Sequence, residues 1–271
     1  MNVRMVCVVG VLAAPALAQE IPPPGRGWSL QFEPSVSFGA AGGDVKLPGL
    51  PAGMKETKIE DLNLDGPRPA ASGELILTSD PWKFMVGGYH LDTGDHDQIA
   101  GAAGQMGAVP FAIGDRLTSS LRFTAVEAAV MRRVELPGSL ATGDSNFRAR
   151  LDVLGGLRVY DAAFDFSAPG GTASGSGFFG HPMIGVKLTM EVIEQFTVDA
   201  QVDLGAMTTG SDSLTYGYDI LAGFMWHPTQ TVGVQIGYRH LAFLLRKGPE
   251  GDRFEYHGAI QGLYAGAVIH F

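Results

Sequence analysis

The chain of 271 residues lacks several features that define common protein classes. It holds one cysteine, Cys7, so an internal disulfide framework is excluded. Charged residues make up only 17% of the sequence, and 28 acidic against 19 basic residues give a formal net charge of −9. This balance argues against nucleic-acid binding, which depends on clustered Lys and Arg. No apolar run in residues 19–271 reaches the ~20 residues that a membrane-spanning helix needs.

Glycine and apolar residues are well represented instead. The 38 glycines are about twice the ~7% expected of an average protein. Hydrophobic residues make up 45% of the chain, which argues against intrinsic disorder. The mean hydropathy of +0.12 is too low for a bundle of membrane helices. These values indicate a folded, glycine-rich chain of one or two domains.

Residues 1–18 have the pattern of a secretory signal peptide. Arg4 precedes an apolar stretch, and the small residues Ala16 and Ala18 stand just before Gln19. We therefore expect cleavage between Ala18 and Gln19 and export of residues 19–271 as one domain. Cys7 lies within the apolar stretch, so the exported chain would hold no thiol.

Apolar and polar residues alternate along much of the exported chain, as they do in β-strands with two different faces. In residues 196–207, for example, Phe196, Val198 and Val202 share one face, while Asp199 and Asp203 share the other. A soluble β-sandwich also alternates, but most of these segments run 10 to 15 residues, longer than the usual 5 or 6. Ten such segments are predicted: 27–39, 67–78, 82–94, 118–134, 146–163, 177–192, 196–209, 214–228, 232–246 and 254–271.

The connections between these segments alternate in length. Those at 79–81, 193–195 and 229–231 are tight, with a longer exception at 135–145. The other set is mostly long, at 40–66, 95–117, 164–176 and 247–253, with a short exception at 210–213. Tryptophans mark the ends with short turns and tyrosines the opposite ends, which predicts two aromatic girdles. These residues are Trp28, Trp82 and Trp226, and Tyr89, Tyr160, Tyr216, Tyr218 and Tyr256. The pattern predicts an all-β, transmembrane antiparallel up-and-down β-barrel of about ten strands, with 8 or 12 as alternatives.

The segment 118–134 does not divide into a polar and an apolar face. Leu121, Phe123 and Ala125 share one face with Glu127, which would place Glu127 in lipid. We therefore expect a β-bulge between Ala125 and Glu127.

The final segment ends in an aromatic residue, Phe271, with Ile269 two positions and Gly266 five positions earlier. In this it resembles the bacterial outer-membrane β-barrel proteins. The resemblance implies an outer-membrane location, with both termini on the periplasmic side. It also implies contact with outer-membrane lipid and lipopolysaccharide, and recognition of Gly266, Ile269 and Phe271 by the barrel-assembly machinery during insertion.

A set of charged residues lies on the polar faces and is expected to point into the lumen. Such residues could line a permeation path, or could fill the interior with ion pairs. A ten-stranded barrel is close to the size at which side chains alone fill it, which favours the second reading. The candidates are Glu33, Glu74, Arg150, Asp152, Arg158, Lys187, Asp199, Asp203, Asp219 and Arg239.

One dense group of titratable residues lies at the end of the predicted barrel that carries the long connections. It comprises His90, Asp92, Asp95, His96 and Asp97, which could bind a cation or supply an acid–base pair. An acidic, solvated loop explains them as well, and the sequence holds no G-x-S-x-G, HExxH, Walker A or CxxC motif. We therefore expect a non-enzymatic barrel without a cofactor, with a structural or surface-interaction role toward an unidentified surface or periplasmic ligand. The alternatives are a narrow channel for small solutes and a hydrolase or metal-binding barrel with its site at the rim.

Overall fold

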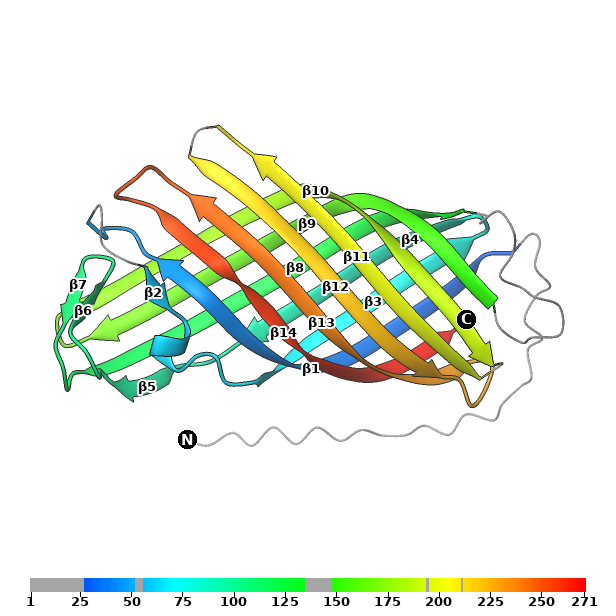
Figure 1. Cartoon of the computed structure of the whole chain (residues 1–271), viewed down its shortest axis with the longest axis horizontal. Coiled ribbons are helices and arrows are strands. Elements are labelled where there is room, and N and C mark those ends of the chain that lie inside the picture. The colour runs from blue at the N-terminus through cyan, green and yellow to red at the C-terminus, as the bar shows by residue number, and fades with distance from the viewer. Residues whose placement is uncertain (1–26, 52–55, 135–147, 194, 211) are drawn as a thin grey trace.

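Ten long strands close into an antiparallel barrel in the computed structural model, which describes residues 27–51, 56–134, 148–193, 195–210 and 212–271. Each strand pairs with its neighbours in sequence, and the last pairs with the first, which confirms the predicted up-and-down barrel (Figure 1). The predicted signal peptide lies outside the described residues. The strands are β1 (Ser29–Lys46), β3 (Arg68–Ser79), β4 (Trp82–Asp92), β8 (Arg116–Val134), β9 (Arg148–Ala168), β10 (Gly171–Ile193), β11 (Phe196–Thr208), β12 (Ser213–Trp226), β13 (Val232–Lys247) and β14 (Phe254–His270).

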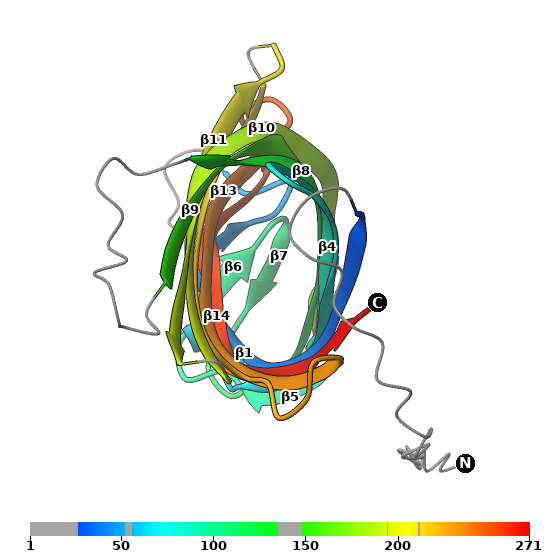
Figure 2. The same cartoon turned by 90° about the vertical axis from the view of Figure 1, so that its right-hand side faces the viewer.

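Short elements gather at one end of the barrel, which we call the loop end; the opposite end is the turn end. They are β2 (Thr57–Lys58), the 3-10 turn η1 (Glu60–Leu62), β5 (His96–Ile99), β6 (Gly104–Met106) and β7 (Val109–Phe111). β2 pairs with β1, β5 pairs with β8, and β6 and β7 form a separate hairpin. Viewed from the turn end, this hairpin lies within the outline of the barrel (Figure 2). Within the described residues, no helix is long and apolar enough to cross a membrane.

The outer surface of the barrel is strongly apolar. Because successive side chains of a strand point to opposite faces, each barrel strand presents every second residue outward. Leu157 and Ile184 are each 61% exposed and Leu263 is 60% exposed. Large apolar patches of this kind are rare on soluble monomers. Further exposed apolar side chains, spread over the other strands, are Val36, Leu75, Phe84, Val86, Val130, Leu204, Ile220, Val234 and Ile236.

The connection expected over 164–176 is mostly strand, which corrects that prediction. β9 and β10 stay paired up to Ala168 and Gly171, and only Pro169 and Gly170 form the turn. The pairing continues because Phe164 and Phe166 keep the inward alternation of β9 and are buried. The glycines of this segment permit tight packing rather than a loose loop.

The bulge expected in 118–134 is absent, which corrects a second prediction. β8 pairs with β4 and β9 in unbroken register through this region. Leu121, Phe123, Ala125 and Glu127 all face the interior and are at most 4% exposed. One face can hold both apolar residues and Glu127 because the interior is apolar near the loop end and charged nearer the turn end.

The prediction of a second aromatic girdle, made of tyrosines at the loop end, is also corrected. Tyr89, Tyr160 and Tyr256 point inward and are 6%, 0% and 0% exposed, so they belong to the interior. Tyr216 is 44% exposed on the outer surface. The tryptophans Trp28, Trp82 and Trp226, by contrast, are all exposed at the turn end.

Candidate functional site: the closed lumen

An apolar plug fills the lumen at the loop end. Phe123, Phe243 and Tyr256 form its centre, with ring centroids 4.7 Å apart for the first pair and 4.8 Å apart for Phe243 and Tyr256. These distances are typical of favourable stacked and edge-to-face packing. We define the apolar plug as Leu47, Ile59, Leu62, Leu64, Met106, Val109, Leu121, Phe123, Tyr160, Phe164, Phe166, Phe243, Leu245, Phe254 and Tyr256.

The connection between β1 and β3 contributes part of this plug. The Ile59 amide donates to the Gly43 carbonyl over 2.8 Å, which ties the segment to the end of β1. η1 then turns Leu62 inward and ends at Asn63, which adopts a left-handed conformation. Ile59, Leu62 and Leu64 are at most 1% exposed. Their burial removes apolar surface from water and closes the mouth.

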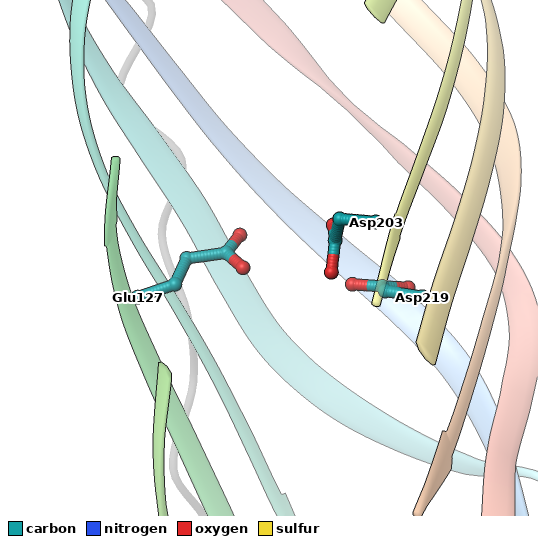
Figure 3. Close-up of side chains that lie close together, drawn as sticks. All are labelled: Glu127, Asp203 and Asp219. Carbon is teal, nitrogen blue, oxygen red and sulfur yellow. The ribbon is translucent and has the colours of Figure 1, made fainter. Parts of the chain in front are cut away.

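A charged cluster centred on Arg158 crosses the lumen on the turn-end side of the apolar plug. The Arg158 guanidinium is fully buried and donates to Glu127 Oε2 over 2.9 Å, Asp203 Oδ1 over 2.8 Å and Asp219 Oδ2 over 3.1 Å. Figure 3 shows Glu127 reaching from one wall of the barrel toward Asp203 and Asp219 on the other. Arg239 joins the cluster through Asp219, at 2.5 Å.

The three carboxylates of this cluster have the spacing of a possible metal site. Ligand atoms of Glu127, Asp203 and Asp219 all lie within 4.8 Å of one another. Arg158 already sits among them and donates to each, so a guanidinium occupies the place that an ion would take. Buried charges are tolerated when they are paired and hydrogen-bonded in this way.

Further ion pairs and one cavity lie between the charged cluster and the turn end. Lys83 Nζ is 2.5 Å from Asp152 Oδ2, Arg150 pairs with Glu191 at 2.8 Å, and Lys187 Nζ is 3.7 Å from Asp199 Oδ2. A cavity of about 30 Å³ adjoins Lys187 and Asp199. This volume holds about two water molecules.

The structure places the ten lumen candidates on inward-facing positions of the barrel strands. Arg150 differs from the rest, because it lies near the turn end with its side chain 38% exposed. The sequence reasoning missed Glu127, which contacts Arg158 at the centre of the cluster. Glu127 shares a face with Leu121 and Phe123, and this could have indicated that all three point inward. The assumption that the lumen is polar along its whole length prevented that interpretation.

The five loop-end candidates do not converge. His90 contacts Thr124 on the outer surface at 2.9 Å, and Asp92 accepts a hydrogen bond from the Gly94 amide within its own turn. The remaining three are also separate: His96 contacts Arg68, Asp97 pairs with Arg116, and Asp95 is exposed. The hydroxyl of Thr118 and the guanidinium of Arg116 hold the pKa of the Asp97 carboxyl below its usual range.

The three residues of the expected insertion signal lie on β14 and just after it. Ile269 shares the outer face with Leu263, and the Phe271 side chain is 73% exposed. Gly266 faces inward, where a side chain would overlap the Pro34 carbonyl oxygen of β1. The Phe271 amide donates to the Leu30 carbonyl over 2.8 Å.

No protein-family model and no curated protein sequence matches this chain. Solved structures resemble it at low identity. The outer-membrane protease OmpT from Escherichia coli is 10% identical, with 92% of this chain and 99% of OmpT covered and a TM-score of 0.47. Neisserial surface protein A is 10% identical over 91% and 98%, with a TM-score of 0.34, and Ail, the attachment invasion locus protein of Yersinia pestis, is 12% identical over 89% and 98%, with a TM-score of 0.31. These values describe a broad likeness of fold and say nothing about activity.

Proposed function

We propose that this chain is an integral outer-membrane barrel with a closed lumen, and that its role is structural or interactive at the cell surface. The observation that carries the proposal is the filling of the lumen at two levels. The apolar plug closes the loop end, and the Arg158 cluster crosses the barrel below it. An apolar outer surface around a charged interior is the arrangement expected of a barrel surrounded by lipid.

Conductance tests the closed lumen against the narrow-channel alternative. We expect the purified chain, inserted into planar lipid bilayers, to produce no stable unitary conductance, while a known porin in the same bilayers does. Stable conductance steps from the purified chain would refute the proposal. Insertion is checked separately by gel mobility, since a folded barrel migrates differently before and after boiling.

The proposal also assigns the loop end to the cell surface and the turn end, with both chain termini, to the periplasm. Outer-membrane lipid and lipopolysaccharide would then contact the apolar outer surface, and the barrel-assembly machinery would read Phe271 during insertion. Exposed positions at the two ends allow a direct test, because residues 19–271 hold no cysteine. On intact cells, a membrane-impermeant maleimide should label Ala102→Cys at the loop end and leave Gln230→Cys at the turn end unlabelled. The reverse pattern would invert the assignment.

A further inference from the structure

A single charged side chain interrupts the apolar outer surface on the turn-end side of the barrel. Among the described residues that face outward there, Arg132 on β8 is the only one that carries a charge. A cation on a lipid-facing surface is costly unless it reaches the polar edge of the membrane or a counter-charge. The outward-facing residues are every second residue, starting from the first, of 30–38, 71–79, 82–88, 126–134, 149–159, 182–190, 196–204, 218–226, 232–238 and 263–269.

The aromatic residues around Arg132 place it at the level of the turn-end membrane edge. Arg132 is the register partner of Trp82 on β4. Trp82 is exposed at the turn end, as is Trp28, whose ring stacks on Phe84 with centroids 6.4 Å apart. Because tryptophan is enriched where the membrane meets water, Arg132 lies where lipid headgroups are expected.

The Arg132 guanidinium is held over an aromatic ring but has no carboxylate partner. Its Cζ atom lies over the Trp82 ring, 5.3 Å from the ring centroid, which is a cation–π distance. The neighbouring cations are paired, Arg133 with Asp80 and Lys83 with a buried aspartate, whereas no ion pair joins Arg132 to any carboxylate in the described part of the chain. A cation–π contact uses none of the N–H donors of the guanidinium, so these remain for an anion.

We propose that Arg132, held over Trp82, binds the phosphodiester group of a phospholipid in the membrane leaflet at the turn end. This rests on the proposed function, because it needs the outer surface of the barrel to lie in lipid. The planar guanidinium can donate two parallel hydrogen bonds to phosphate oxygens. The acyl chains of the same lipid would lie along Val153, the register partner of Arg132, and along the paired Phe84 and Val130, which are 40%, 43% and 41% exposed.

Native mass spectrometry of the folded full chain in dodecyl maltoside micelles tests lipid binding directly, because this detergent carries no phosphate. We expect saturable retention of one dilauroyl phosphatidylglycerol per chain. Dilauroylglycerol, which has the same acyl chains without the phosphate, should not be retained. R132Q should lower the apparent affinity for the phospholipid by about tenfold or more, since it removes the charge-assisted hydrogen bonds. R132K keeps the charge but loses the planar donor fork, so its affinity should lie between the two.

R122Q is the matched control, because Arg122 is also an exposed arginine on the outer face of β8 but lies nearer the loop end. It should bind the phospholipid as the unaltered chain does. W82L should weaken binding, since it removes the ring over which the Arg132 guanidinium is held.

Three results would overturn the proposal. The first is equal binding by R132Q and the unaltered chain, and the second is an equal loss in R122Q, which would indicate general attraction between charges. The third is displacement of the lipid by inorganic phosphate alone, which would indicate an anion site rather than a lipid site. R132Q should still change its gel mobility on boiling, so a loss of lipid binding is distinguishable from a failure of the barrel to form.

Discussion

Arg158→Met should destabilise the barrel far more than any comparable surface change. Arg158 is fully buried and donates hydrogen bonds to Glu127, Asp203 and Asp219. Methionine fills much of the same space but leaves three carboxylates facing one another, with Arg239 as their nearest counter-charge. Removing one partner of a buried ion pair costs about 3–5 kcal/mol, and three acceptors lose their donor here. We therefore expect the free energy of unfolding to fall by at least about 3 kcal/mol.

Arg246→Met is the matched control, because Arg246 also donates two hydrogen bonds to a single carboxylate across a strand pair. Its bonds to Glu255 measure 3.0 and 2.7 Å, but its side chain is 34% exposed. Partly exposed ion pairs of this kind contribute about 0–1 kcal/mol.

Urea unfolding in lipid vesicles, followed by the fluorescence of the exposed tryptophans at the turn end, measures both variants. Adding Asp203→Asn to Arg158→Met should restore part of the loss, since it removes one of the stranded charges. If Arg158→Met costs no more than Arg246→Met, the cluster does not hold the lumen together in the way described.

Two further predictions concern packing and pH. Gly262→Ala should destabilise the barrel by about 1–3 kcal/mol because its methyl group would overlap the Phe38 carbonyl oxygen, whereas Gly42→Ala, with open space around it, should change little; equal midpoints in urea would contradict this. Because the pKa of the Asp97 carboxyl is lowered in the folded chain, its stabilising effect relative to Asp97→Asn should be full at neutral pH. That difference should vanish as the pH falls below about 4 toward the lowered pKa, and a difference that grows on acidification would refute the reasoning.

The alternation of residues was sufficient to predict the barrel and its strand count, because a strand with one face toward lipid must repeat every second residue. Phe196, Val198 and Val202 illustrate this, since each is apolar and none has a charged neighbour on its own face. What the sequence could not supply was the convergence of side chains across the lumen. Arg158, Asp203 and Asp219 lie on three strands, and no local pattern states that their side chains meet.

The loop-end residues, which were candidates beside the reading of an acidic solvated loop, do not converge for the opposite reason. His90, Asp92 and Asp97 are close in sequence, but they lie on a strand, at its end and beyond the following turn. Their side chains therefore do not point toward one another. His90 points outward from β4, Asp92 bonds within the turn, and Asp97 pairs with β8. A high density of titratable residues along a chain is therefore no sign that their side chains come together, because the strand and the turn direct them apart.

The irregular pattern of residues 118–134 follows from a change of surroundings along a regular strand. Toward the turn end, Val126 and Val130 face outward and Glu127 inward. Toward the loop end, Arg122 faces outward and Phe123 inward, so the apolar face has switched sides. β9 switches in the same way, with Leu157 and Val159 outward beside inward Arg158, and then Asp161 outward beside inward Tyr160.

The apolar face changes sides at the same level of the barrel in β8 and β9, because Val126 pairs with Val159 and Thr124 pairs with Asp161. A barrel in lipid can be polar inside, whereas a barrel in water needs an apolar core. The switch between Thr124 and Val126 is therefore where we expect the proposed bilayer to end. Beyond it the barrel is built as a soluble protein is, with an apolar plug inside and charges outside. The same boundary explains why residues 118–134 do not divide into one polar and one apolar face. It also explains why apolar side chains fill the lumen at the loop end.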